Sequence, residues 1–152
     1  TGNGLPRRNY NVKGLLITMW QNILKQNLIS NITIRGNETT AMFLDTKTDE
    51  KLKMSVSIHD ESLDANIIDK EGSQITRAYA EKIDDETFQA KDVRTDPRFI
   101  RRGYGENLYH LIAYALVNQG YNFVPDDAQS GEMQQMWDKN TSYGSWDIPD
   151  YM

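Results

Sequence analysis

The middle of the chain alternates apolar and polar residues with a period of two, and this pattern limits the fold more than any other feature. Residues 51–58 alternate lysine or serine with leucine, methionine, valine and isoleucine, and residues 63–67 repeat the alternation. Antiparallel strands that bury one face have this period. Turn residues at 70–73 and 84–86 separate further expected strands. The segment is therefore predicted to be an antiparallel meander, whose other strands span 32–34, 40–45, 75–83 and 87–93.

The C-terminal part of the chain changes to a helical period. An apolar stripe over 108–116 stops before Gly120, a favoured residue just after a helix. The short apolar run 121–124 is typical of a buried strand, and Ser130 is placed to cap a second helix. A helix between two strands implies that these strands pair in parallel. The predicted fold class is α+β, with a mixed, mostly antiparallel sheet, a parallel β-α-β unit in the C-terminal half and helices packed on both faces.

The chain has 152 residues, which is long enough for one domain with a substantial core, and we expect a single domain over its whole length. Apolar residues at helical spacing predict an amphipathic helix over 13–29. Residues 1–12 are expected to form a flexible lead-in to this helix.

Composition excludes several functions. The chain has no cysteine, which rules out disulfides, thiolate metal sites and a cysteine nucleophile. Its formal net charge of −5 argues against a nucleic-acid partner, because phosphate neutralisation needs a basic surface. The two histidines lie far apart without a repeated ligand spacing, so no metal site is expected. No apolar run approaches the length of a bilayer span, and we expect a cytoplasmic protein without a membrane partner.

The segment Arg101-Arg102-Gly103-Tyr104-Gly105 lies between an expected strand and a helix that is expected to begin at Gly105. Glycine lets the backbone approach a bound group closely, and the start of a helix presents unpaired amides and the positive end of its dipole. Together with two arginines, this arrangement is suited to binding an anion. A plain helix-entry turn is the alternative interpretation of the two glycines.

The C-terminal half resembles the Gcn5-related N-acetyltransferases, or GNAT family, over roughly residues 88–139. The family signature is a strand, Gln or Arg, two residues, Gly, one residue, Gly or Ala, and then a helix. Ile100-Arg101-Arg102-Gly103-Tyr104-Gly105 matches its glycines, after a segment 93–99 in which Pro97 lies two residues before an aromatic. The resemblance implies an acyl-CoA-binding acetyltransferase-like domain with a cofactor-binding core at 88–139. It also implies acetyl-CoA as the co-substrate, without a metal.

The resemblance further implies where acetyl-CoA binds. Its pyrophosphate would lie on the backbone amides of 102–106. Its pantetheine arm would pair with the strand before the loop, at 93–95, where that strand splays from 121–124. The implied cofactor-binding residues are Val93, Arg94, Thr95, Arg101, Arg102, Gly103, Tyr104, Gly105, Glu106 and Ser130.

Three positions depart from the family pattern. Ile100 stands where the family has the leading Gln or Arg. Gln89 replaces the glutamate most associated with the general base, and Trp137 replaces the helix tyrosine that often protonates the thiolate. Neither glutamine nor tryptophan can make these proton transfers. The remaining catalytic candidates are two strand carboxylates and another phenol, namely Glu81, Asp92 and Tyr143.

Two functions from different classes follow. The first is an acetyl-CoA-dependent N-acetyltransferase, which moves an acetyl group to an amine by direct transfer in a ternary complex. Its acceptor is an amine-bearing molecule, either a protein lysine or N-terminus or a small amine. The second is a catalytically degenerate domain of the same fold, acting as an acyl-CoA sensor or as a structural or interaction module of a larger protein. A homodimer is an open expectation for either function.

Overall fold

The computed structural model describes residues 28–152, so the expected lead-in 1–12 and the expected helix up to residue 27 lie outside the described residues. Ile29, expected as the last residue of that helix, instead begins a strand and pairs with Phe43. It is buried, as an apolar residue on the inner side of a helix would also be. The expected helix was therefore wrong for residues 28 and 29, a turn and the start of a strand, because burial does not distinguish the two elements at a junction.

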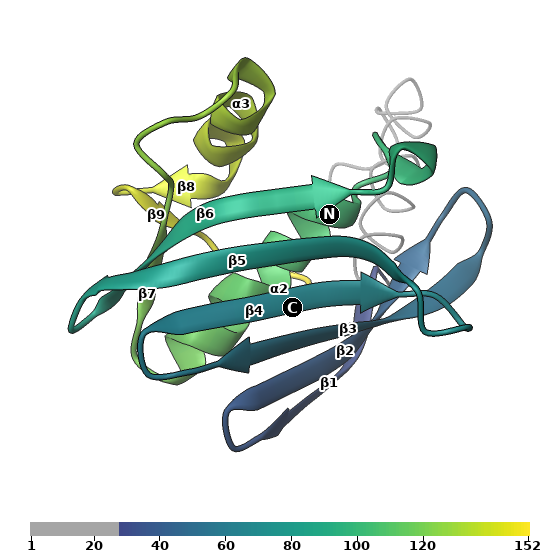
Figure 1. Cartoon of the computed structure of the whole chain (residues 1–152), viewed down its shortest axis with the longest axis horizontal. Helices are drawn as coiled ribbons and strands as arrows, with labels where there is room; N and C mark the ends of the chain where they lie inside the picture. Colours follow the sequence, from purple (N-terminus) through teal and green to yellow (C-terminus); the bar gives the residue numbers. More distant parts are fainter. Residues whose placement is uncertain (1–27) are drawn as a thin grey trace, which may run out of the picture.

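Seven strands form one sheet in sequence order (Figure 1). The first six run antiparallel to their neighbours, and the seventh pairs in parallel with the sixth. The mixed, mostly antiparallel sheet with a parallel unit in the C-terminal half is thus confirmed. The strands are β1 (Ile29–Arg35), β2 (Glu38–Asp45), β3 (Glu50–Ile58), β4 (Ser62–Ile68), β5 (Gln74–Asp84), β6 (Thr87–Thr95) and β7 (Asn122–Val124).

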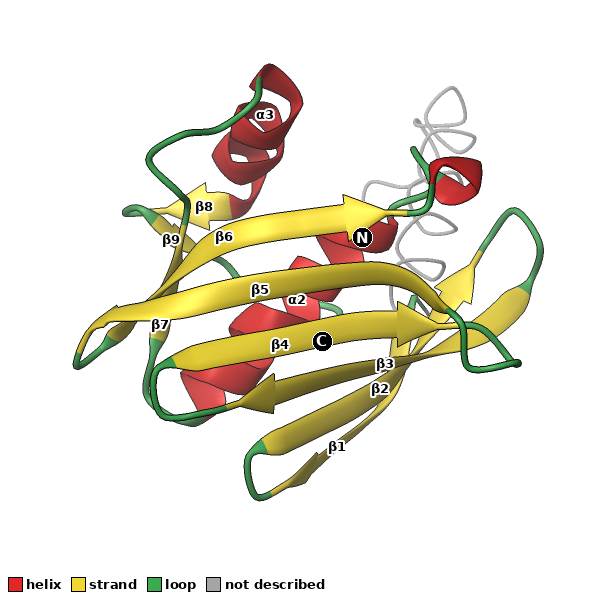
Figure 2. Ribbon diagram, viewed as in Figure 1, coloured by secondary structure: helices red, strands yellow, loops and turns green. Residues whose placement is uncertain are grey.

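Helix α2 (Tyr104–Asn118) connects β6 to β7 and lies across one face of the sheet (Figure 2). It ends before Gly120, whose φ of 86° is left-handed, as the sequence predicted. Ser130 caps the next helix by accepting a hydrogen bond from the Met133 amide at 3.2 Å, which confirms its expected position. The remaining elements are the 3-10 helix η2 (Pro97–Phe99), helix α3 (Gly131–Asn140) and a hairpin of β8 (Thr141–Ser142) and β9 (Ser145–Trp146). No helix within 28–152 is long and apolar enough to cross a membrane.

The core lies between α2 and the face of the sheet that it covers. Alternate residues of β3 and β4 such as Met54, Val56 and Leu63 are completely buried there, as are Leu108 and Leu111 of α2. Burying each such side chain contributes about 1.5–3 kcal/mol, so this contact is the main source of stability. The opposite face is polar along the same strands, and within the described residues no helix covers it (Figure 2). The fold prediction included helices on both faces of the sheet, and among residues 28–152 helices cover only one face.

Strands β6 and β7 pair only over a short stretch and then separate. The parallel pairing joins residues 87–89 to residues 122–124. Beyond it, Lys91 is a bulge in β6, because Tyr79 and Ala80 of β5 pair with Asp92 and Ala90. After β7 the chain continues into Pro125, which has no amide to donate to a sheet ladder. The second half of β6 is therefore bordered by β5 on one side and by the candidate site on the other.

Candidate functional site

Two hollows lie along the separated part of β6. The inner cavity, of about 150 Å³, is bounded by β6, α2, α3 and the segment after β7. The loop groove, of about 360 Å³, follows the glycine loop and the start of α2. Val93, Ser130 and Met133 line both hollows, so the two adjoin each other. Small-molecule sites in proteins measure about 300–1,000 Å³, and the loop groove falls within that range.

The glycine loop presents backbone amides to the loop groove. Gly103 caps α2 with a φ of 79°, and Arg101 also has a positive φ, of 65°. The first hydrogen bond of α2 runs from the Asn107 amide to the Gly103 carbonyl at 3.0 Å. The amides of residues 104–106 precede that bond and therefore lack an acceptor within the helix. Among residues 28–152 these three amides have no backbone acceptor, and at the positive end of a 15-residue helix they are suited to binding an anion.

Gly105 brings this helix start close to β6. A side chain at Gly105 would place its Cβ 3.6 Å from Val93 Cγ2 and 4.0 Å from Thr95 Oγ1. Glycine therefore leaves open the floor of the loop groove between the helix amides and the strand. This space, with donors on one wall and an extended backbone on the other, fits a phosphate-bearing ligand with an extended arm such as acetyl-CoA.

The polar groups of the Arg102 and Tyr104 side chains bind a carboxylate at the end of β2. The Arg102 guanidinium donates to Asp45 Oδ2 at 2.6 Å, and the Tyr104 hydroxyl donates to the same oxygen at 2.7 Å. Arg102 is absent from the residues that line the groove, whereas Tyr104 is one of them. The expectation that the Arg102 side chain supports the anion site thus needs correction, because its charge is paired with a buried carboxylate.

The contacts of Asp45 explain its ionisation. Burial alone would raise its pKa, but hydrogen bonds from Tyr104, the Lys47 amide and Arg102 outweigh burial and lower it. Burial and the same contact raise the pKa of Tyr104, so that its hydroxyl stays protonated and donates. The charged form of Asp45 is therefore the one that the folded chain stabilises.

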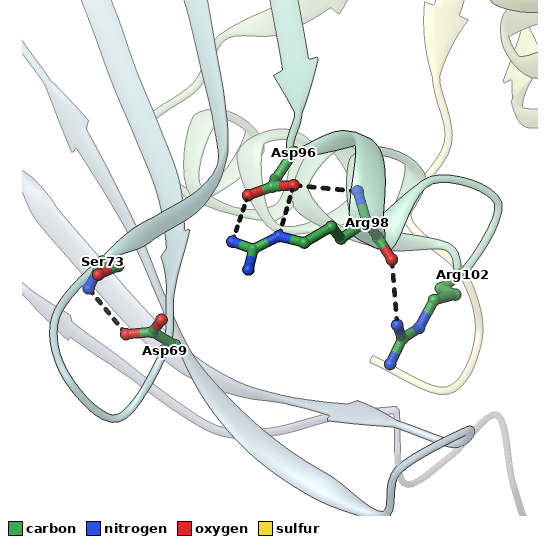
Figure 3. A network of polar contacts seen from close by, with 5 residues as sticks. All are labelled: Asp69, Ser73, Asp96, Arg98 and Arg102. Atoms are coloured by element: carbon green, nitrogen blue, oxygen red, sulfur yellow. Dashed lines mark hydrogen bonds and ion pairs between the residues drawn. The ribbon is translucent and has the colours of Figure 1, made fainter.

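A second carboxylate braces the approach to the loop. Asp96 caps η2 by accepting from the Arg98 amide at 3.0 Å, and it also binds the Arg98 guanidinium at 2.8 Å (Figure 3). These hydrogen bonds lower the pKa of Asp96 to about 2. The Arg98 carbonyl in turn accepts from Arg102 at 3.4 Å. The turn between β6 and α2 is thus held by contacts at both of its ends.

Arg101 is the loop arginine whose side chain faces solvent beside the groove. Its guanidinium lies 3.9 Å from Glu132, and both side chains are 85% exposed. An ion pair this exposed contributes little, so Arg101 is available to a ligand. Arg94 instead pairs with Asp92 at 3.0 Å and lines neither hollow. Thr95 lines the groove and accepts from the Thr76 hydroxyl at 3.3 Å.

Glu106, at the start of α2, lines the groove but is held by α3. Its carboxylate accepts from Lys139 and from Asn140, each at 2.8 Å. Burial would raise the pKa of Glu106, but these two contacts lower it. The first turn of α2 is thereby fixed to α3 across the groove. This pairing also offsets a negative charge that would otherwise oppose an anionic ligand.

The inner cavity gathers titratable groups that the sequence alone did not bring together. Lys91 and Asp126 lie 3.8 Å apart across the gap between the separated strands, and Asp92 is a further lining residue. Tyr109 of α2 and Trp137 of α3 are buried at its inner end. Burial, then the charges of Asp92 and Asp126, raise the pKa of Tyr109, so its hydroxyl is protonated at neutral pH. The sequence did not indicate Tyr109 as a site residue, because it lies among the buried residues of a helix.

The other catalytic candidates lie apart from the inner cavity. Glu81 is exposed on β5 opposite Gln89, and Tyr143 is fully exposed in the turn between β8 and β9. Neither residue lines either hollow. Gln89 is buried, and its amide donates to the Pro125 carbonyl at 3.2 Å. Of the three catalytic candidates, Asp92 alone lies at the cavity. Within residues 28–152, no three His, Asp or Glu side chains gather as a metal site.

Comparisons with known proteins give one partial structural likeness. No family model matches the chain, and neither does any curated protein. The structure of AAC(6')-Iy in complex with the bisubstrate analogue CoA-S-monomethyl-acetylneamine is similar, with a TM-score of 0.42 and 16% identity. The match covers 51% of this chain and 58% of that one, so the chain spans little more than half of its structural neighbour. The observed glycine loop and parallel β6–α2–β7 unit agree with the α+β fold that the GNAT resemblance of the sequence implied.

Proposed function

We propose that the chain is an acyl-CoA N-acyltransferase, which binds acetyl-CoA along the separated half of β6 and transfers the acetyl group to an amine. One observation carries the proposal: free helix amides, the loop groove and the inner cavity follow one another along a single strand. A ligand with phosphates at one end, an extended arm and a small reactive group matches this order.

Each part of the ligand has a counterpart among the described residues. The pyrophosphate binds the amides of 104–106, and the Arg101 guanidinium adds a charge-assisted contact. The pantetheine amides pair with the edge of β6 at 93–95, where pairing with β7 has ended, as an added strand would. Ser130 and Met133 border the passage between the two hollows, where the arm turns inward.

The groups at the inner cavity supply the proton transfers. The amine nitrogen attacks the thioester carbonyl carbon, a C–N bond forms and the C–S bond breaks. Asp92 accepts the proton that the amine loses, directly or through water. The Tyr109 hydroxyl, which stays protonated at neutral pH, donates a proton to the departing thiolate and is reprotonated from solvent. Asp92 and Tyr109 thus take the roles that Gln89 and Trp137 are unable to perform.

The charges around the inner cavity favour a cationic acceptor. Asp92 and Asp126 line the cavity with a single cation, Lys91, so the lining is negative on balance, and the chain as a whole carries a formal charge of −5. Protonated amines are attracted to such a surface before they lose a proton to a base. A small polyamine or a lysine side chain meets this requirement.

One observation favours an acyl-CoA sensor as the second candidate function. Gln89 holds the chain beyond β7 through its contact with Pro125, so this position serves the structure of the site without providing a base. A chain that needs acetyl-CoA binding but no turnover would keep the loop and tolerate this glutamine.

Calorimetric titration with acetyl-CoA tests the proposed function. We expect saturable binding to the unchanged chain and none to Gly103→Glu, which adds a negative charge at the free amides. Gly120→Glu is the matched control, because Gly120 has a similar φ of 86° at the other end of α2. Thiol release with a polyamine present then separates enzyme from sensor. Failure of the unchanged chain to bind acetyl-CoA would contradict both functions.

A further inference from the structure

We propose that Asp45 is the positioning residue of the glycine loop, so that a carboxylate at the end of β2 controls affinity for the phosphate end of the ligand. This inference rests on the proposed function. Asp45 precedes Arg102 by 57 residues and Tyr104 by 59, and no feature of the signature includes it. It contributes to neither hollow directly and acts through the loop residues that it binds.

Three donors hold the Asp45 carboxylate in one position. Oδ2 accepts from both Arg102 and Tyr104, while Oδ1 accepts from the Lys47 amide at 2.9 Å. The residue is 1% exposed, and its Arg102 partner is 17% exposed at the side chain. Hydrogen bonds to a buried charge are among the stronger ones in proteins, and they fix direction as well as distance.

The two loop side chains that bind Asp45 flank Gly103 in the sequence. Gly103 has a φ of 79°. Arg101, which precedes Arg102, also has a positive φ, a backbone conformation that costs a non-glycine residue conformational energy. A backbone in this conformation persists only where its surroundings impose it. The anchors on both sides of Gly103 supply that constraint, and they set the direction of the free amides at 104–106.

Aromatic packing supports the same anchors. The Tyr104 ring meets Phe43 of β2 edge-on, with centroids 4.9 Å apart, and also contacts Phe99 at 5.4 Å. The Arg102 guanidinium lies over the Phe99 ring at 5.0 Å. Among residues 28–152, the buried Arg102 Nε has no hydrogen-bond partner. The contacts with Asp45 and Phe99 therefore fix the position of the Arg102 guanidinium.

An ordinary stabilising ion pair is the competing explanation, and the two predict different measurements. A pair that only stabilises the fold changes the midpoint of unfolding and leaves the affinity of the folded chain for acetyl-CoA unchanged. A positioning residue changes the affinity at temperatures where the variant is fully folded. It also loosens the loop before any ligand is added.

The test uses two variants and two matched controls. Asp45→Asn removes the charge at similar size, and Tyr104→Phe removes one hydroxyl while keeping the ring. Asp84→Asn is the carboxylate control, because Asp84 also accepts a backbone hydrogen bond, from Glu86 in the β5–β6 turn. Tyr114→Phe is the phenol control on α2. We expect acetyl-CoA to bind Asp45→Asn about tenfold more weakly, Tyr104→Phe less weakly than that, and both controls as the unchanged chain.

A ligand-free measurement separates failure of this inference from failure of the proposed function. Amide relaxation of Gly103 and Gly105 should show order parameters of about 0.85 in the unchanged chain and below about 0.6 in Asp45→Asn. A rigid loop in Asp45→Asn, or unchanged acetyl-CoA affinity in both folded variants, would overturn the role of Asp45. If the loop loosens but the unchanged chain binds no acetyl-CoA, Asp45 positions the loop and the proposed ligand is wrong.

Discussion

Strand β6 is bordered differently at its two ends. At its start, residues 87–89 pair with β5 on one side and with β7 on the other. At its end, residues 93–95 pair with β5 and with no other described strand, and the loop groove takes the place of β7. Phe88 in the first part is completely buried, whereas Val93 in the second is only partly buried and lines both hollows.

This difference predicts a structural role for the paired end of β6 and a ligand-binding role for its open end. The paired end is closed by ladder hydrogen bonds and by the Gln89 contact with Pro125. The open end begins at the Lys91 bulge and leaves backbone groups and side chains for a ligand. Substitutions at the paired end should therefore change stability, while those at the open end should change ligand affinity.

The largest expected effect is on stability at the paired end. Phe88→Ala removes a ring that is 0% exposed and packs edge-on against Tyr121 at 5.0 Å. We expect the free energy of unfolding in urea to fall by about 3–5 kcal/mol. Acetyl-CoA affinity of the remaining folded chain should change little. A loss below about 1 kcal/mol would show that this end is not part of the core.

The next effect concerns a buried histidine of α2 that contacts the aromatic cluster beside the inner cavity. His110 accepts a hydrogen bond from the Trp146 indole at 3.0 Å. Burial lowers its pKa from 6.5 to about 4, while Glu106 raises it and Lys139 lowers it further. Below pH 6.5 the unfolded chain gains a proton here that the folded chain takes up only near pH 4, so stability falls as the pH drops.

Urea unfolding at two pH values measures this linkage. Between pH 7 and pH 5 the unchanged chain should lose about 2 kcal/mol through His110. His110→Gln, which keeps an acceptor for Trp146, should lose much less over the same interval. His59→Gln is the control and should behave as the unchanged chain. Equal slopes in all three chains would contradict the assignment to His110.

A third substitution tests the boundary between the two ends. Gln89→Glu replaces the amide that donates to Pro125 with a carboxylate at a site that is 8% exposed. We expect a loss of about 1–3 kcal/mol at pH 7, because a donor disappears and a charge is buried. The loss should lessen as the pH falls and the carboxyl becomes protonated. A gain in acetyl transfer without a loss of stability would instead make residue 89 part of the catalytic site.

The smallest effect belongs to the exposed arginine of the open end. Arg101→Ala should weaken acetyl-CoA binding by about fivefold, through one lost charge-assisted contact, and leave stability unchanged. Arg35→Ala, an exposed arginine at the end of β1, is the control. Calorimetry at two salt concentrations checks the result, because the difference between the variants should shrink as salt screens the contact. Equal affinities at low salt would remove Arg101 from the site.

Local patterns in the sequence were sufficient for most of the fold. The alternation in residues 51–58 and 63–67 predicted β3 and β4, since a half-buried strand has the same period. Gly120 and Ser130 marked a helix end and a helix start through backbone rules that act within a few residues. The glycine loop was found for the same reason, although Tyr104 and not Gly105 begins the helix.

The candidate site depends on contacts that no local pattern encodes. Asp45 and Arg102 are 57 residues apart, so no local sequence pattern predicts their contact. Tyr109 follows the pattern of a core residue, and only the separation of β6 from β7 places it beside a cavity. The sequence shows that Gln89 replaces the family glutamate. Its hydrogen bond to Pro125 could not be predicted, because it depends on where the chain runs after β7.

Backbone amide chemical shifts during a titration with acetyl-CoA locate the ligand site residue by residue. We expect the largest shifts at residues 104–106 and 93–95, at the open end of β6. The amides of 87–89 and of the polar face of β3 and β4 should shift little. Shifts confined to that polar face or to the paired end, with the glycine loop unchanged, would contradict a ligand site at the open end of β6.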